Sequence, residues 1–509
     1  MMKKTFQMMF ALLAAVLVLA SCTKDKSVAT RLIPENAVIV GRFDVKQTID
    51  KSGLNPNSRL FKKLKSNLSD ADMSEEMREK LIDIVLNPNS SGIDFDQPVF
   101  FYFTGQNDNM AGLVGTVTNK GDLIELLNQI AEENNDDEVE EEDGIYRAGD
   151  TMVFSDDWFF VGDINDDIIE TLKDMASTGE GSMAEDEGMQ KLCEKTGVLS
   201  FLVSGKGLGQ IDDRDMRKAL QQLPEGLDIN DVAAVADLQL NDGEALMESQ
   251  ILAFSTEWQE YIEESESAVN DITDELVEYV SNDGLAVFLN LDTNKLWEKI
   301  EQLLEANGMN DAETMNVAQK VFQSMEGSLA LDVNGFTGER PNLAVFAKSR
   351  DSFIVEALSG MMEGEDLTST GTNSFRFVEY DYDWDAYFNG GSELNRIPSA
   401  YLDFGSERNI TYLYYNQQSQ EFGSARNGFP ARELKGKGCY ARFNFDFFKN
   451  IDEDAIGEET SMIMKEVAKL FNYAEAYYEG EGKSVLRIAT NDEDKTPLAI
   501  ILDYIASMI

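Results

Sequence analysis

The sequence predicts an α+β fold, a tandem of four β-α-β-β-α units arranged as two duplicated halves. Three observations lead to this prediction. A strand phrase recurs along the chain, a helical pattern follows each copy, and a strand–turn–strand–helix pattern comes after that. Because every such unit has a sheet face to bury, we expect mixed or antiparallel sheets with helices packed on them.

The strand phrase has three clear copies and one weaker copy. The clear copies are AVIVGRF at 37–43, LAVFLNL at 285–291 and CYARFNF at 439–445, and the weaker one is VLSFLVS at 198–204. An aspartate ends each clear copy, just before a helical pattern begins; these are Asp44, Asp292 and Asp446. Aspartate is a preferred N-cap residue, so we expect these side chains to cap helices and not to form a metal cluster.

Two further β-prone runs, separated by a polar turn, follow each phrase. They read VFFYFT and AGLVGTV in the first unit, VAAVADLQL and ALMESQILAF in the second, SLALDV and LAVFA in the third, and SVLRIA and LAIIL in the fourth. The second pair is joined by Asn241-Asp242-Gly243, a strong hairpin signal. The four units therefore start near residues 31, 196, 280 and 433.

Strand-rich inserts lengthen the first and third units, at 145–163 and 375–415. The order long, short, long, short favours a duplicated pair. We expect a first half at 31–279 and a second half at 280–509.

The first residues resemble a bacterial lipoprotein signal peptide. Lys3 and Lys4 supply positive charge, and the apolar run at 8–20 is too short to span a bilayer permanently. The run ends in LASC, a lipobox-like sequence whose cysteine is Cys22. An ordinary secretory signal with a chance cysteine is the alternative. We expect a signal peptide at 1–21, a lipidated linker at 22–30, and lipidation at Cys22.

Thr23 follows Cys22, in place of the aspartate linked to inner-membrane retention. The expected location is therefore the outer membrane, with a lipid anchor as the membrane contact. The sequence leaves the periplasmic and cell-surface faces both open.

Composition excludes several classes of function. The chain has 94 acidic and 43 basic residues in 509, a net charge of −51, which disfavours nucleic acid as a partner. It has no histidine, which removes Ser-His-Asp catalysis and the usual zinc sites. Cys193 and Cys439 could form one disulfide or lie buried as apolar side chains. We expect no enzyme activity, no cofactor, no metal and no catalytic residue.

One aromatic segment is a candidate ligand site. Tyr380, Tyr382, Trp384 and Tyr387 stand among carboxylates, a composition that suits stacking on sugars. The alternative is a strand that alternates aromatic and acidic side chains between its two faces. Asp381, Asp383 and Asp385 begin like a calcium loop, but the pattern then fails. The acidic run at 132–143 is expected to be a solvated loop.

Two phrases carry a resemblance to a known family. Ile33-Pro34-Glu35-Asn36-Ala37 opens the exported body, and NPNSSGIDFDQPV occupies residues 87–99. With these phrases the chain resembles an uncharacterised family of Bacteroidota lipoproteins of unknown function. The resemblance implies a cell-envelope location and a shared fold, and it carries no catalytic residues.

The leading functional interpretation is an outer-membrane-anchored lipoprotein that binds or scaffolds an envelope component without catalysis. The partner would be an envelope protein or a glycan. One alternative is a surface glycan-binding protein that uses the aromatic segment. The other is a histidine-free hydrolase with a pair of carboxylates.

Replacing Cys22 by serine should abolish acylation, because the thiol receives the lipid. Palmitate labelling should be lost, and the chain should leave the membrane fraction, since acyl chains supply the anchor. The Cys193→Ser variant is the control and should keep both. Persistent labelling of Cys22→Ser would contradict the lipoprotein prediction.

Overall fold

In the computed structural model the chain forms two compact units. Unit 1 comprises Met1–Tyr261 and Asp492–Ile509, and unit 2 comprises Ile262–Asn491. The structure describes residues 28–508 apart from 72, 106–110, 212, 222, 225, 307–310, 338–339, 363–365, 383–395, 417–421, 426 and 451–456.

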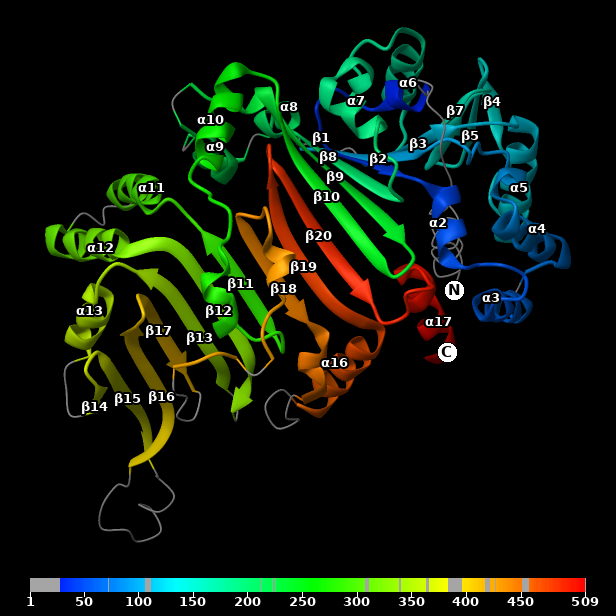
Figure 1. The fold of residues 1–509 in the computed structure, drawn as a ribbon. Coiled ribbons are helices and arrows are strands. Elements are labelled where there is room, and N and C mark those ends of the chain that lie inside the picture. The colour runs from blue at the N-terminus through cyan, green and yellow to red at the C-terminus, as the bar shows by residue number, and fades with distance from the viewer. Residues whose placement is uncertain are drawn as a thin grey trace. The chain divides into compact units, whose positions relative to one another are not determined.

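Unit 1 is built on an antiparallel sheet, as expected (Figure 1). Its strands are β1 Ala37–Phe43, β2 Val99–Thr104, β3 Ala111–Thr116, β4 Glu140–Glu142, β5 Ile145–Ala148, β6 Met152–Phe154, β7 Trp158–Gly162, β8 Leu199–Ser204, β9 Val232–Asn241 and β10 Glu244–Ala253. They lie in the order β4-β5-β6-β7-β3-β2-β1-β8-β9-β10.

The sheet of unit 2 is also antiparallel. Its strands are β11 Leu285–Asn290, β12 Met325–Thr337, β13 Arg340–Ser349, β14 Leu367–Gly371, β15 Ser374–Tyr382, β16 Arg396–Glu407, β17 Ile410–Tyr415, β18 Cys439–Asn444, β19 Phe471–Gly480 and β20 Lys483–Thr490. They lie in the order β14-β15-β16-β17-β13-β12-β11-β18-β19-β20. Counted from the first strand of each unit, the two orders are the same.

Helices and 3-10 turns (η) connect the strands. Unit 1 has η1 Val28–Leu32, α2 Val45–Ser52, α3 Arg59–Ser69, α4 Glu75–Leu86, η2 Pro88–Ser91, α5 Lys120–Asn134, α6 Asp166–Thr178, η3 Met183–Glu185, α7 Glu187–Cys193, α8 Gly205–Gly209, α9 Arg214–Leu220, η4 Ile229–Asp231 and α17 Pro497–Met508. Helix α10, Thr256–Glu266, runs from unit 1 into unit 2. Unit 2 has η5 Asp274–Tyr279, α11 Thr293–Ala306, α12 Ala312–Ser324, α13 Phe353–Met361, η6 Ala431–Leu434, η7 Phe445–Asn450 and α16 Glu458–Leu470. A β-α-β-β-α succession therefore begins at each of β1, β8, β11 and β18.

The hairpin predicted in the second unit is present. Strands β9 and β10 pair from Asn241 and Glu244 outward, and Gly243 between them has φ +81°. Glycine supplies this left-handed conformation without steric cost.

The fourth hairpin was placed wrongly from the sequence. The pair is β19 with β20, whereas the predicted strand LAIIL lies inside helix α17. Pro497 starts this helix, and the hydroxyl of Thr496 accepts a hydrogen bond from the Ala499 N–H at 3.2 Å. A short apolar run is compatible with either a strand or a buried helix, so its periodicity alone could not decide. The helix packs against α2 and α3 of unit 1.

Two of the three predicted aspartate caps are confirmed. The carboxylate of Asp44 accepts from the Gln47 N–H at 2.8 Å, and that of Asp292 accepts from the Asn294 N–H at 3.0 Å. Asp446 does not cap, because the chain enters η7 one residue earlier. Asn444 takes the role, accepting from the Asp446 N–H at 2.9 Å.

Alternation along the strands gives the sheet of unit 1 two apolar faces. On β2, Phe100 and Tyr102 belong to a core cluster that includes Leu32 of η1 and Leu172 of α6. Val99 belongs to a second cluster, which lies against α5. Unit 2 has its own core, and there the hydroxyl of Tyr440 donates to the buried Glu475 carboxylate at 2.5 Å.

The Asp44→Ala variant should lose more stability than Asp292→Ala. Asp44 is fully buried and lies 3.8 Å from the buried guanidinium of Arg42, so its removal takes away a cap and a charge partner together. We expect a loss of about 2–4 kcal/mol for Asp44→Ala and about 1 kcal/mol for Asp292→Ala. Urea unfolding measures both.

Asp446→Ala is the matched control, because it changes the same strand phrase without removing a cap. Its unfolding free energy should stay within about 0.5 kcal/mol of the parent. A loss as large as that of Asp44→Ala would refute the assignment of the caps.

Candidate functional site

The predicted aromatic platform is only partly within the described structure. Tyr380 and Tyr382 belong to β15, while Trp384 and Tyr387 lie outside the described residues. The guanidinium carbon of Arg396 lies 4.1 Å from the centre of the Tyr380 ring, so a cation already occupies one face of that ring. The sugar-binding role of this segment therefore stays a prediction, with Tyr380 and Tyr382 placed on β15.

Cys22 lies outside the described residues, and Cys193 and Cys439 are free thiols. Within the acidic run, α5 ends at Asn134 and residues 140–142 form the exposed edge strand β4, so only part of this run is a loop. Among the described residues, no group of three or more acidic or cysteine side chains could hold a metal ion. No helix in the described part of the chain is long and apolar enough to cross a membrane.

Unit 1 contains a cavity of about 1200 Å³ that the sequence did not reveal. Its floor is one face of the sheet, made by side chains of seven strands. They are Phe43 of β1; Val99, Phe101 and Phe103 of β2; Leu113 of β3; Ala148 of β5; Met152 of β6; Val161 of β7; and Leu199 of β8. This volume is at or above the usual size of small-molecule sites, about 300–1,000 Å³.

Helix α5 forms the other wall of the cavity. It contributes Leu127, Ile130 and Ala131, which face the sheet. The helix begins at a cap where the Asn119 side chain accepts from the Gly121 N–H at 3.0 Å. It ends at Asn134, and its C-cap Asn135, with a φ of +56°, turns the chain toward β4. Asparagine caps therefore fix where this helical wall begins and ends.

A close approach of backbone and ring shapes the floor. Gly41 of β1 pairs with Phe101 on one side and Phe201 on the other, and these two rings meet edge to face at 5.9 Å. A Cβ atom at Gly41 would lie 1.9 Å from Cζ of Phe101. Only glycine leaves room for the Phe101 ring over this strand.

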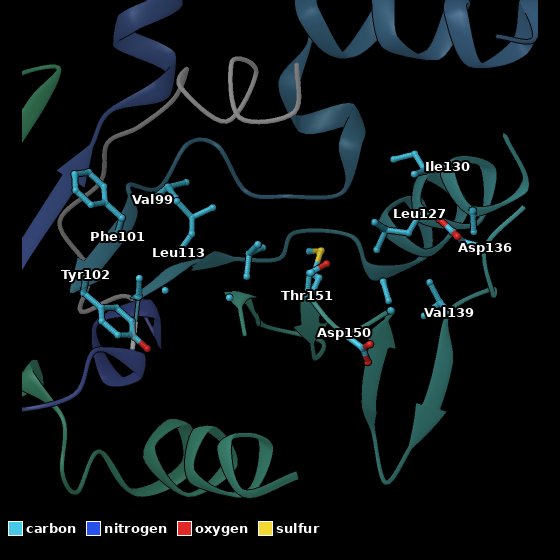
Figure 2. A pocket seen from close by; sticks show the side chains of 18 of the residues that line it. Val99, Phe101, Tyr102, Leu113, Leu127, Ile130, Asp136, Val139, Asp150 and Thr151 are labelled. Atoms are coloured by element: carbon cyan, nitrogen blue, oxygen red, sulfur yellow. The ribbon is translucent and has the colours of Figure 1, made fainter. Parts of the chain in front are cut away.

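The two ends of the cavity differ in chemistry. Figure 2 shows Phe101 and Leu113 at one end, and Asp136 and Asp150 at the other. The pairing of Glu140 with Arg147 brings the loop that follows α5 beside the turn between β5 and β6. Asp136 and Asp150 therefore reach the same end of the cavity from different elements.

Hydrogen bonds hold this acidic end in place. The side-chain oxygen of Asn128, on α5, accepts from the Val139 N–H at 2.8 Å. The carbonyl of Thr151 accepts from the Gly162 N–H at 2.9 Å, which ties the turn to β7. Helix α5 thus holds one segment, and strand β7 holds the other.

Nearby cations are paired with carboxylates. Arg147 forms an ion pair with Asp150 at 2.8 Å, and Lys120 forms one with Asp156 at 2.5 Å. The hydrogen bond to Asp156, followed by that to Tyr146, raises the pKa of the Lys120 ammonium above its ordinary value. Asp136 and Asp137 take part in no ion pair within the described structure.

The cavity could not be read from sequence because its walls come from segments far apart in the chain. The only local signal is the run VFFYF at 99–103, which is apolar on both faces. Phe103 in this run is 42% exposed, unusual for a large apolar side chain in the middle of a sheet. An apolar cavity with carboxylates at one end can bind an elongated apolar molecule.

Comparison with known proteins yields a family and no function. A family model described as a domain of unknown function, DUF4836, matches residues 29–386. No curated protein and no solved structure gave a significant match. The matched segment contains all of the cavity-lining residues. The chain therefore belongs to the DUF4836 family.

Proposed function

We propose that this chain is a non-enzymatic lipoprotein of the outer membrane that binds an apolar ligand in the cavity of unit 1. The single observation that carries the binding function is the apolar cavity between α5 and the sheet. Apolar cavities bind by removing apolar surface from water, at about 25 cal/mol per Å², or about 0.8 kcal/mol for each CH₂ buried. The lipid anchor rests on Cys22 and the lipobox-like sequence.

We also propose that the two units arose by duplication of one ancestral unit. The support is the shared strand order and the recurrence of the β-α-β-β-α succession. Differences between the units then indicate specialisation. In unit 1 the Asn128 side chain fixes the loop that closes one end of the cavity.

The Ala148→Trp variant should lose ligand binding, because Ala148 is a small, half-buried residue that lines the cavity. An indole at this position would fill space that the ligand needs. We expect the parent protein to bind the uncharged dye phenylnaphthylamine saturably, with a rise in fluorescence, and the variant to bind at least about tenfold more weakly, a difference of about 1.4 kcal/mol.

Thr368→Trp is the matched control, because it adds an indole to the exposed edge strand β14 of unit 2. It should bind the dye like the parent. Circular dichroism should show both variants folded. Equal dye binding by the parent and Ala148→Trp would refute the cavity as the binding site.

A further inference from the structure

The cavity is apolar at one end and acidic at the other, and this difference indicates the kind of ligand it binds. We infer that the ligand is a small amphiphile with a single alkyl chain and a cationic head, the chain lying on the phenylalanine floor and the head beside Asp136 and Asp137. This inference rests on the proposed function and deepens it. The apolar end of the cavity, its acidic end and the charge of the chain support it.

The apolar end continues beyond the cavity. Phe103, which lines it, pairs with Ile39 of β1, and these side chains are 42% and 38% exposed. Both belong to the face of the sheet that carries Phe101. An alkyl chain lying from Leu113 toward Phe103 would cover apolar surface that is otherwise in water.

The acidic end has carboxylates, and no lysine or arginine is among the described residues that line it. Asp136 and Asp137 line the cavity, are exposed, and form no ion pair within the described structure. The nearby Arg147 is already engaged by Asp150 at 2.8 Å. An anionic head would meet two carboxylates there, whereas a cationic head would pair with them.

The whole chain favours the same sign of charge. Its net charge of −51 raises the local concentration of cationic ligands and lowers that of anionic ones. This general attraction does not select the cavity, so the experiment must separate it from the local effect of Asp136 and Asp137.

Three probes with the same chain and different heads make the test: dodecyltrimethylammonium, dodecanol and dodecyl sulfate, each below its micelle concentration. Each is titrated against bound phenylnaphthylamine on the full mature chain. We expect the ammonium to displace the dye at roughly fivefold lower concentration than the alcohol, because two nearby carboxylates each contribute a modest attraction in water. The sulfate should be weakest, and added salt should reduce the differences.

The Asp136→Asn/Asp137→Asn variant should lose the preference for ammonium and keep its affinity for dodecanol. The control is Glu257→Gln/Glu260→Gln on α10, which changes the net charge equally at exposed positions away from the cavity and should keep the preference. Both pairs of substitutions lie on the surface, and thermal unfolding checks the fold.

The outcomes separate the two proposals. Failure of all three probes to displace the dye, with Ala148→Trp binding it normally, would overturn the cavity function itself. Equal displacement by the three heads would leave the cavity function standing and overturn the cationic ligand. A preference that survives in Asp136→Asn/Asp137→Asn, or is lost equally in the α10 control, would also overturn it.

Discussion

The central strands of unit 1 carry apolar side chains on both faces, and every other feature of that unit follows from the need to cover them. Strand alternation sends Phe100 and Tyr102 to one face and Val99 and Phe101 to the other. Elements that precede and follow the strands, η1 and α6 among them, cover the first face. Helix α5 covers the second face only in part. The cavity lies between this helix and the sheet, over apolar side chains of the strands.

Burial also explains how polar groups are arranged. Asp44 and Arg42 are buried together, and one carboxylate oxygen of Asp44 accepts a hydrogen bond from the first turn of α2. A buried Asp237 accepts from the Ser200 hydroxyl at 2.7 Å and from the Gly197 N–H at 3.0 Å. Carboxylates inside the sheet thus have hydrogen-bond donors, while those at the cavity's end face water. Of these, Asp150 pairs with Arg147, whereas Asp136 and Asp137 form no ion pair within the described structure.

The sequence predicted local structure well and the site not at all. Recurrent strand phrases, the Asn-Asp-Gly hairpin and the caps Asp44 and Asp292 could be found because each depends on residues adjacent in the chain. LAIIL at 498–502 was misassigned because the periodicity of five apolar residues does not distinguish a strand from a helix. The prediction that Asp446 caps a helix was wrong because β18 ends at Asn444, one residue before the end of the strand phrase. The cavity depends on how far α5 stands from the sheet, a tertiary distance that no run of residues encodes.

Helix α17 has a consequence for how the protein is made. Helix α17 packs against α2 and α3, so unit 1 contains segments from before and after unit 2, whereas unit 2 is one continuous segment. During synthesis, unit 2 can therefore complete its fold before α17 has emerged. Unit 1 must wait for α17, although it begins first. Loss of α17 would leave the earlier unit incomplete and the later one whole.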